Sequence, residues 1–212
     1  MRVGERRLFR WRTLDLVTAA MLGVAFGVAY WGWAAAYTAL GGVIAAVPPL
    51  GGMFAGPWLI AGVVGGLVIR RPGAALLTEL LAANVEFALG NQWGVSTLIS
   101  GTLQGLGVEI VLALFMFRRF GPLVAAAGAA LAAAMETAYE YVAYDYATLF
   151  GARGTLFYLL AFMASGALVA GVGGWLLVKA LARTGALATF PVGRELAAEC
   201  EAAIRRESAR AR

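Results

Sequence analysis

The chain has 212 residues, of which 61% are hydrophobic and only 14% are charged, and its formal net charge is +5. A soluble domain has about 45–50% apolar and about 25% charged residues, so this composition excludes a water-soluble globule and predicts a membrane protein. The chain has no histidine and one cysteine, Cys200, which excludes Ser-His catalysis, histidine-ligated zinc or haem, and an internal disulfide. We therefore expect no metal, no cofactor and no catalytic residue.

Apolar runs of about 20 residues, the length that crosses about 30 Å of hydrocarbon, predict an all-α bundle of six transmembrane helices. They lie near residues 14–37, 43–69, 73–90, 95–117, 122–147 and 156–181. Prolines and glycines at 48–52 predict a loop or a broken helix in the second run, so only about 54–69 is expected to be regular helix there. Residues 1–182 are expected to form a single membrane domain.

Basic residues alternate along the connections between these runs. They precede the first run and follow the second, fourth and sixth, at Arg2, Arg6, Arg7, Arg10, Arg12, Arg70, Arg71, Arg118, Arg119, Lys179, Arg183 and Arg194, whereas the other connections contain only Arg153. By the positive-inside rule, both termini are cytoplasmic and residues near 40–53, 91–94 and 148–155 face outside. The basic tail 183–212 is expected to be a cytoplasmic helix or frayed, facing anionic lipid rather than nucleic acid.

All the connections are short, and no nucleotide-binding motif is present. No soluble catalytic or ATP-binding domain fits in this chain. If transport uses ATP, a partner subunit must bind it.

Acidic residues are the strongest functional signal. Six of them lie within the runs or at their rims, at Glu79, Glu86, Glu109, Glu136, Glu140 and Asp145, and no basic residue lies between Arg71 and Arg118 or between Arg119 and Arg153. A charge at membrane depth costs about 2.5–3.5 kcal/mol. Several of these acids therefore need protonation, water or a cationic ligand.

The spacing of the acids predicts where they point. Glu79 and Glu86 are two helical turns apart and share a face, and Glu136 and Glu140 share a face with Tyr144. With the polar and aromatic residues near the outer ends, they predict an outward-facing cavity for an organic cation or nitrogen heterocycle. The other expected substrate-binding residues are Tyr30, Trp33, Tyr37, Trp58, Asn91, Gln92, Trp93, Gln104 and Tyr139.

Some of the acids and aromatic residues need not contact a substrate. Glu109 is expected on another helix face, and Asp145 is expected to be solvated at the rim. Tryptophan and tyrosine also gather at membrane interfaces without binding anything. A buried carboxyl group can have a purely structural role, so this alternative stays open for each acid.

Small residues form a stripe on the first run at Ala19, Gly23 and Gly27. Small residues allow helices to approach closely in lipid. The stripe predicts a surface on which another membrane subunit docks, with close packing inside the bundle as the alternative.

The run from Arg70 to Gly94, RRPGAALLTELLAANVEFALGNQWG, resembles the YkoE-type substrate-binding (S) subunit of energy-coupling-factor (ECF) transporters. The similarity covers about residues 11–182. It implies a plasma-membrane subunit that captures thiamin or its hydroxymethylpyrimidine precursor (HMP) and works with a transmembrane coupling subunit and two ATPase subunits. Related subunits have Ala-x-x-x-Ala on the first span, where this chain has Ala19-x-x-x-Gly23.

Two other classes of function stay open on the residues alone. A self-contained proton-coupled transporter would use Glu79 or Glu86 to carry protons, but the chain lacks the clear inverted repeat of many secondary transporters. An intramembrane enzyme is disfavoured, because no nucleophile with an adjacent base is visible.

Overall fold

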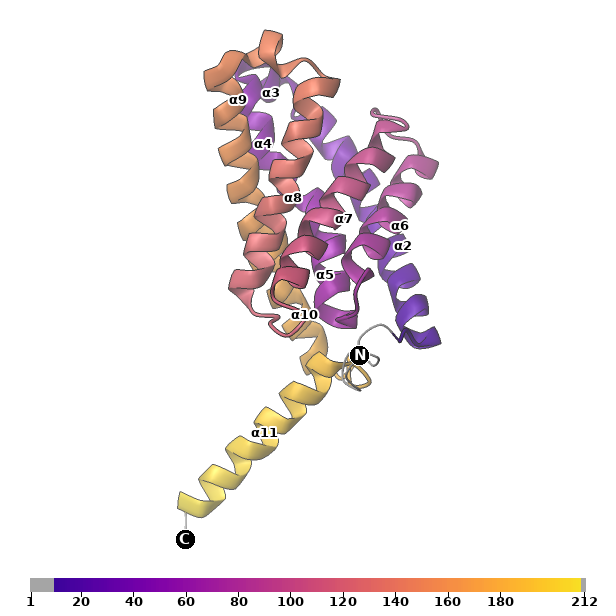
Figure 1. Cartoon of the computed structure of the whole chain (residues 1–212), viewed down its shortest axis with the longest axis vertical. Coiled ribbons are helices and arrows are strands. Elements are labelled where there is room, and N and C mark those ends of the chain that lie inside the picture. The colour runs from indigo at the N-terminus through magenta and orange to yellow at the C-terminus, as the bar shows by residue number, and fades with distance from the viewer. Residues whose placement is uncertain (1–9, 211–212) are drawn as a thin grey trace.

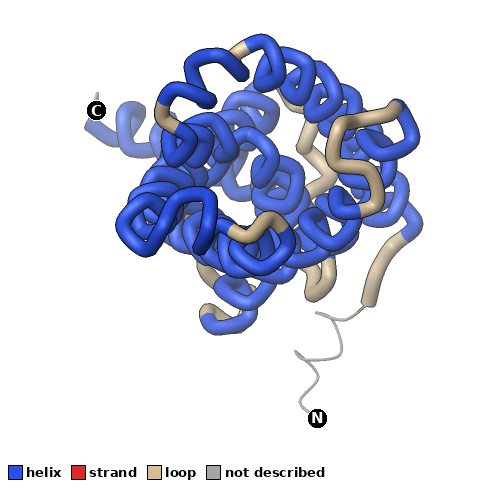
Figure 2. Tube along the Cα trace, turned by 90° about the horizontal axis from the view of Figure 1, so that it is seen from above, coloured by secondary structure: helices blue, strands red, loops and turns tan. Residues whose placement is uncertain are grey.

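The structure is a computed structural model that describes residues 10–210, and these residues are helical apart from short turns (Figures 1 and 2). In chain order the α-helices are α2 (Thr13–Ala39), α3 (Gly41–Ala46), α4 (Gly51–Ala55), α5 (Ile60–Ile69), α6 (Ala74–Leu89), α7 (Ser96–Leu114), α8 (Pro122–Ala143), α9 (Tyr146–Ser165), α10 (Gly174–Arg183) and α11 (Pro191–Arg210). Two 3-10 turns, η1 (Pro48–Leu50) and η2 (Gly56–Leu59), flank α4, and a π-helix, η3 (Gly166–Gly173), joins α9 to α10.

The predicted all-helical membrane protein is confirmed. Five helical segments of the described chain are long and apolar enough to cross a membrane: Thr13–Ala39, Pro48–Ile69, Ser96–Leu114, Pro122–Ala143 and Tyr146–Arg183. The third predicted span corresponds to α6, which has 16 residues. Its length of about 24 Å is short of the usual hydrocarbon thickness, so length and composition alone support five of the six predicted spans.

The second membrane segment is a broken helix, one of the two forms that its prolines predicted. It runs through α3, η1, α4 and η2 before regular helix begins at Ile60. Pro48 and Pro57 stand at the starts of η1 and η2, where a residue without an N–H group is tolerated. The regular helix therefore starts only midway along the segment, which leaves the first N–H groups of α5 inside the bundle.

The sixth segment begins earlier than the sequence predicted. Residues 148–155, expected to be an outer connection, belong to α9. The helix changes direction at Gly151, whose φ of 62° lies in the left-handed region that glycine adopts readily. This change of direction allows a helical turn to replace the predicted loop.

The small-residue stripe on α2, at Ala19, Gly23 and Gly27, packs against α6 of the same chain, the alternative that the sequence left open beside docking of another subunit. Ala19 is fully buried. A Cβ atom on Gly23 would lie 2.5 Å from Leu81 Cβ, and one on Gly27 would lie 2.5 Å from Val85 Cβ. The glycines let the two helices of the same chain approach closely, as the neighbouring positions of α2 and α6 in Figure 1 show, so α6 occupies this face in the described chain.

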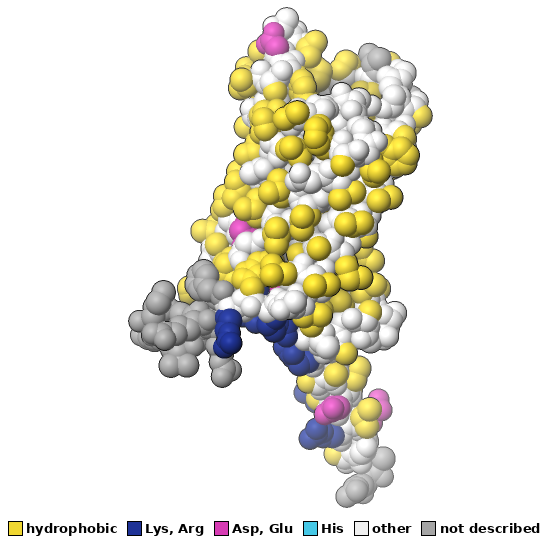
Figure 3. All heavy atoms as spheres, turned by 90° about the vertical axis from the view of Figure 1, so that its right-hand side faces the viewer, with side chains coloured by type: hydrophobic (Ala, Val, Ile, Leu, Met, Phe, Trp, Pro, Cys, Tyr) yellow, Lys and Arg dark blue, Asp and Glu magenta, His cyan; other side chains and the backbone are white. Residues whose placement is uncertain are grey.

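Both ends of the described chain lie at one end of the bundle, which we call the basic end: α2 begins there and α11 projects from it (Figure 1). Lysine and arginine side chains gather there, whereas hydrophobic side chains cover the length of the bundle (Figure 3). Arg2, Arg6 and Arg7 lie outside the described residues.

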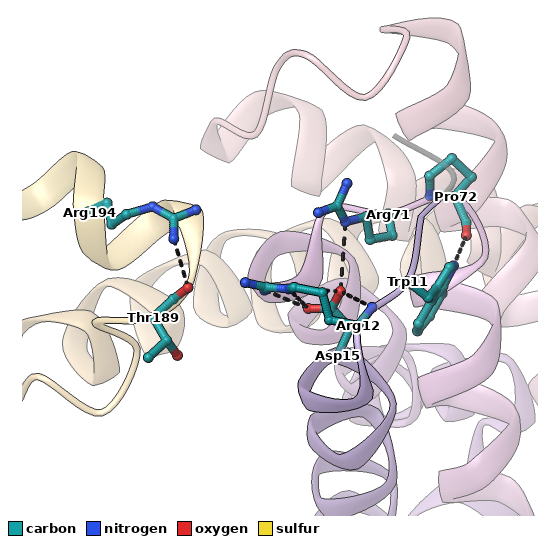
Figure 4. Close-up of polar contacts among 7 residues, drawn as sticks. All are labelled: Trp11, Arg12, Asp15, Arg71, Pro72, Thr189 and Arg194. Carbon is teal, nitrogen blue, oxygen red and sulfur yellow. Dashed lines mark hydrogen bonds and ion pairs between the residues drawn. The ribbon is translucent and has the colours of Figure 1, made fainter. Parts of the chain in front are cut away.

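A buried acid anchors the start of α2 at the basic end (Figure 4). Asp15 is fully buried and pairs with Arg12, with 2.6 Å between Arg12 Nη2 and Asp15 Oδ1. Its other oxygen lies 3.8 Å from Arg71 Nε. Trp11 Nε1 donates to the carbonyl oxygen of Pro72 at 3.2 Å, so the start of α2 is tied to the turn between α5 and α6.

We predict that Gly23→Ala and Gly27→Ala destabilise the protein by about 1–3 kcal/mol each, because an added methyl group must push α2 and α6 apart. Gly32→Ala on the same helix is the matched control, since nothing lies within 4 Å of its Cβ position. Thermal unfolding in detergent measures the effect. Equal midpoints for all three variants would contradict the close packing of α2 on α6.

Candidate functional site: a buried cavity of acids and aromatic rings

A cavity of about 190 Å³ lies within the part of the bundle farther from the basic end. Its lining comes from α2, α4, η2, α6, α7, α8 and α9 and from the turns that follow α6 and α8. The lining residues are Tyr30, Tyr37, Ala55, Trp58, Glu79, Ala83, Glu86, Trp93, Thr97, Ser100, Gln104, Glu136, Glu140, Tyr144, Tyr146, Tyr158 and Phe162. The four acids at positions 79, 86, 136 and 140, which the helical spacing paired, therefore face one space.

Glu79, the deeper of the two acids on α6, is hydrogen-bonded to the start of α5. The first N–H groups of a helix have no partner within it, and two of them are used here. Gly62 N–H donates to Glu79 Oε2 at 2.6 Å, and Ala61 N–H donates to the hydroxyl oxygen of Tyr30 at 2.8 Å. The Tyr30 hydroxyl in turn donates to Glu79 Oε2 at 3.3 Å. The positive end of the α5 dipole adds to the stabilisation of this carboxyl group.

Two carboxyl oxygens in the cavity have no hydrogen-bond partner within the described residues: Glu79 Oε1 and Glu136 Oε2. Both side chains are almost fully buried. Glu136 also contacts Ser100 and Gln104 of α7 through hydrogen bonds. A buried polar atom without a partner is costly, so these two oxygens are available to donors of a bound molecule.

The other two acids lie one or two helical turns nearer the far ends of their helices. Glu86 Oε1 accepts a hydrogen bond from Trp58 Nε1 at 3.1 Å. Glu140 Oε2 accepts one from the Tyr158 hydroxyl at 2.8 Å. Each aromatic donor fixes the direction of its carboxyl group, and Asn91 also hydrogen-bonds to Glu86.

Aromatic rings form one wall of the cavity. The ring of Trp58 lies edge-on to Tyr37 at 5.4 Å and to Trp93 at 5.2 Å between centroids. The rings of Tyr37 and Trp93 are 6.0 Å apart. Three rings from three different segments thus offer faces and edges to a planar or cationic ligand.

The lining also includes residues that the sequence analysis missed. Tyr146, Tyr158 and Phe162 lie on α9, and the Tyr146 and Tyr158 rings are 5.1 Å apart. Tyr146 fell at the end of the predicted fifth span, and the other two were assigned to the sixth span without a role. A helical spacing of four residues between Tyr158 and Phe162 is the signal that could have placed them on one face.

Four of the predicted site residues stand behind the lining. Asn91 donates to Thr97 Oγ1 at 2.7 Å and also interacts with Glu86, and Gln92 accepts a hydrogen bond from Thr38. Trp33 Nε1 donates to the carbonyl oxygen of Phe54 at 2.9 Å. The Tyr139 hydroxyl lies 2.8 Å from Ser96 Oγ, which is itself 3.0 Å from the Tyr144 hydroxyl. These residues contact lining residues or their neighbours and are not part of the lining themselves.

Glu109 lies away from the cavity, as its position on the helix predicted. It accepts hydrogen bonds from the N–H groups of Gly73 at 2.5 Å and Ala75 at 3.1 Å, at the start of α6. A carboxylate at a helix N-terminus is a stabilising cap. Its role is therefore structural.

The cavity lining is rich in acidic and aromatic side chains and has no basic ones. Its lining includes four carboxyl groups and eight aromatic side chains of tyrosine, tryptophan or phenylalanine, but no lysine or arginine. Such a site favours a ligand that brings positive charge or several N–H donors, together with a flat ring. A sugar or an anion fits it poorly.

Comparison with known proteins identifies the family. The family described as ABC-type cobalt transport system, permease component, matches residues 14–135. YkoE of Bacillus subtilis (strain 168), a candidate HMP/thiamine permease protein, is 32% identical over 195 residues, which cover 88% of this chain and 92% of YkoE. A crystal structure of an S-component of an ECF transporter has a TM-score of 0.88 and 29% identity, and the match covers 93% of this chain and 98% of that one. The chain belongs to the S components of ECF transporters.

This membership confirms the family that the run from Arg70 to Gly94 resembled, and it makes the chain a transport protein rather than an enzyme. S components of ECF transporters capture a substrate at the membrane. The cavity has the burial and the convergent polar groups that a small ligand needs.

We predict that Tyr30→Phe destabilises the protein by about 1–3 kcal/mol, because it leaves the Ala61 N–H group buried without an acceptor. Tyr37→Phe is the matched control, since Tyr37 lines the same cavity from the same helix and contributes ring contacts. Chemical unfolding in mixed micelles compares the two. The same loss of stability in both variants would argue against the specific hold of Tyr30 on the start of α5.

Proposed function

We propose that this S component captures thiamin or its hydroxymethylpyrimidine precursor. One observation carries the proposal: four carboxyl groups and a set of aromatic rings face a single cavity whose lining contains no basic side chain. Thiamin brings a thiazolium cation and an aminopyrimidine, and HMP brings the aminopyrimidine alone. The relative YkoE, a candidate HMP/thiamine permease protein, supports the same substrate class.

The geometry gives each group a role in this proposal. Glu79 and Glu136, with their unpartnered oxygens, accept hydrogen bonds from amino or protonated ring nitrogens deep in the cavity. Glu86 and Glu140, fixed by Trp58 and Tyr158, lie nearer the far end. The aromatic rings stack on the heterocycles and attract positive charge.

The topology in this proposal has six spans with both termini in the cytoplasm. α6 lies between α2 and α7 (Figure 1) and crosses with them despite its 16 residues. The basic end faces the cytoplasm of a plasma membrane, in agreement with the positive-inside rule. The cavity then opens toward the outside, and α11 with the rest of the tail 183–212 lies in the cytoplasm.

The segment 40–53 covers the cavity in this proposal. Ser165 Oγ donates to the carbonyl oxygen of Met53, the last residue of this segment, at 2.7 Å. Trp33 Nε1 donates to the carbonyl oxygen of the next residue, Phe54. The chain brings no ATP-binding motif. A transmembrane coupling subunit and two ATPase subunits therefore supply the energy that turns capture into release.

We predict that Glu86→Gln and Glu140→Gln each weaken binding of thiamin and HMP roughly tenfold or more, the effect of losing a hydrogen bond to a charged group. Asp145→Asn is the control for general attraction of cations, because Asp145 is exposed, lies outside the cavity lining, and its left-handed backbone (φ 50°) suits asparagine. Calorimetry on the purified variants measures the dissociation constants. Unchanged affinity in both glutamate variants would refute the proposed site.

We also predict that the chain alone does not accumulate substrate in liposomes, and that uptake appears when coupling and ATPase subunits are added with ATP. Under the proton-coupled alternative, the lone chain would transport substrate and a proton ionophore would abolish that transport. Radiolabelled uptake with and without the partners separates the two. Ionophore-sensitive uptake by the lone chain would overturn the ATP-coupled proposal.

A further inference from the structure

A second cavity, of about 230 Å³, lies at the basic end, between α5, α10 and α11 and the turn at residues 120–121. It shares no lining residue with the substrate cavity. Trp58 and Arg70, which line one cavity each, are 12 positions apart on the same segment, a distance of roughly 18 Å along a helix. The second cavity is therefore a separate feature of the bundle.

The walls of the second cavity combine apolar and aromatic groups with cations. Lys179 Nζ lies 4.8 Å from the centre of the Trp175 ring, and the Arg70 guanidinium lies 4.4 Å from that of Phe120. Arg70 also binds both carboxyl oxygens of Glu195, at 2.5 and 2.9 Å. Arg70 Nε donates to the carbonyl oxygen of Leu67. Each terminal nitrogen of Arg70 has two N–H groups and uses one of them on Glu195, so one N–H group on each remains available to donate.

Two opposite charges in the lining are left without an ion partner. Within residues 10–210, Lys179 stacks on Trp175 and has no carboxyl oxygen within the 4.0 Å that defines an ion pair. Glu199 lies one turn beyond Glu195 on α11, is exposed, and likewise has no cation at that distance in the described chain. The cavity thus has a free ammonium group and a free carboxylate on opposite helices.

The position of this cavity matches a membrane boundary. Leu168 and Leu176, on the same membrane segment as Trp175 and Lys179 of the lining, are 67% and 55% exposed, as expected of side chains in contact with lipid tails. Trp175 and Lys179 supply the aromatic ring and the snorkelling cation typical of the headgroup region. A lipid with its tails along these leucines would bring its headgroup to the cavity.

We propose that this cavity binds a phospholipid whose headgroup contains a phosphate and a primary amine, namely phosphatidylethanolamine. The phosphate accepts from Lys179 and the free N–H groups of Arg70, and the ammonium donates to Glu199. A lipid with net negative charge is disfavoured, because the carboxylates of Glu195 and Glu199 repel it. A choline headgroup has no N–H group with which to bind Glu199.

The test is lipid retention. The delipidated full chain is mixed with phosphatidylethanolamine, phosphatidylcholine or phosphatidylglycerol in mild detergent, and bound lipid is counted by native mass spectrometry. We expect phosphatidylethanolamine to exceed the other two, and Lys179→Gln and Glu199→Gln each to lower its retention about fivefold. Arg183→Gln, on the same helix and outside the lining, is the control that should change nothing.

Each other outcome overturns the proposal. Equal retention of phosphatidylcholine would remove the role of the amine, and stronger retention of phosphatidylglycerol would make this a simple anionic site. Loss of retention in Arg183→Gln would show non-specific attraction by the basic end. Unchanged retention of phosphatidylethanolamine by both lining variants would show that the lipid does not bind in this cavity. A membrane protein that copurifies and occupies the cavity would assign the cavity to a partner subunit. Glu199 is exposed, so its variant stays informative even if Lys179→Gln misfolds.

Discussion

The cavity of acids and aromatic rings depends on the break in the second membrane segment. Because regular helix begins only at Ile60, the N–H groups of Ala61 and Gly62 are free within the bundle, where lipid and apolar side chains cannot satisfy them. Tyr30 and Glu79 accept these hydrogen bonds. The break in the helix thus has two effects. The N–H groups at the start of α5 gain acceptors, and the buried Glu79 carboxyl group gains donors and the positive end of a helix dipole.

Beyond this pair, the cavity has an excess of acceptors that the protein does not satisfy. Glu79 and Glu136 each have an oxygen without a partner in the described chain, and Glu86 and Glu140 are held by one aromatic donor each. No cation among the lining residues balances them. Unsatisfied buried acceptors are costly, so this imbalance is the basis on which we propose a ligand with donors or positive charge.

The sequence predicted side-chain positions correctly where helical spacing alone decides which way a side chain points. Glu79 and Glu86 line the same cavity because they are two turns apart on one helix. For Ala19 the same reasoning left two neighbours open, since a stripe of small residues marks close packing without saying whether the neighbouring helix belongs to the same chain. It also missed Tyr158, because placing α9 beside this cavity depends on a change of direction at Gly151 and on tertiary contacts that apolar periodicity does not encode.

The central claim is that carboxyl groups in the cavity recognise the amino-ring of the substrate. The most direct measurement is calorimetric binding of thiamin and of an analogue in which a carbonyl oxygen replaces the exocyclic amino group. The account predicts that the analogue binds roughly tenfold or more weakly, because it presents an acceptor to a carboxylate, and that Glu136→Gln removes much of this difference. Equal affinity of the two compounds for the unmodified protein would contradict it.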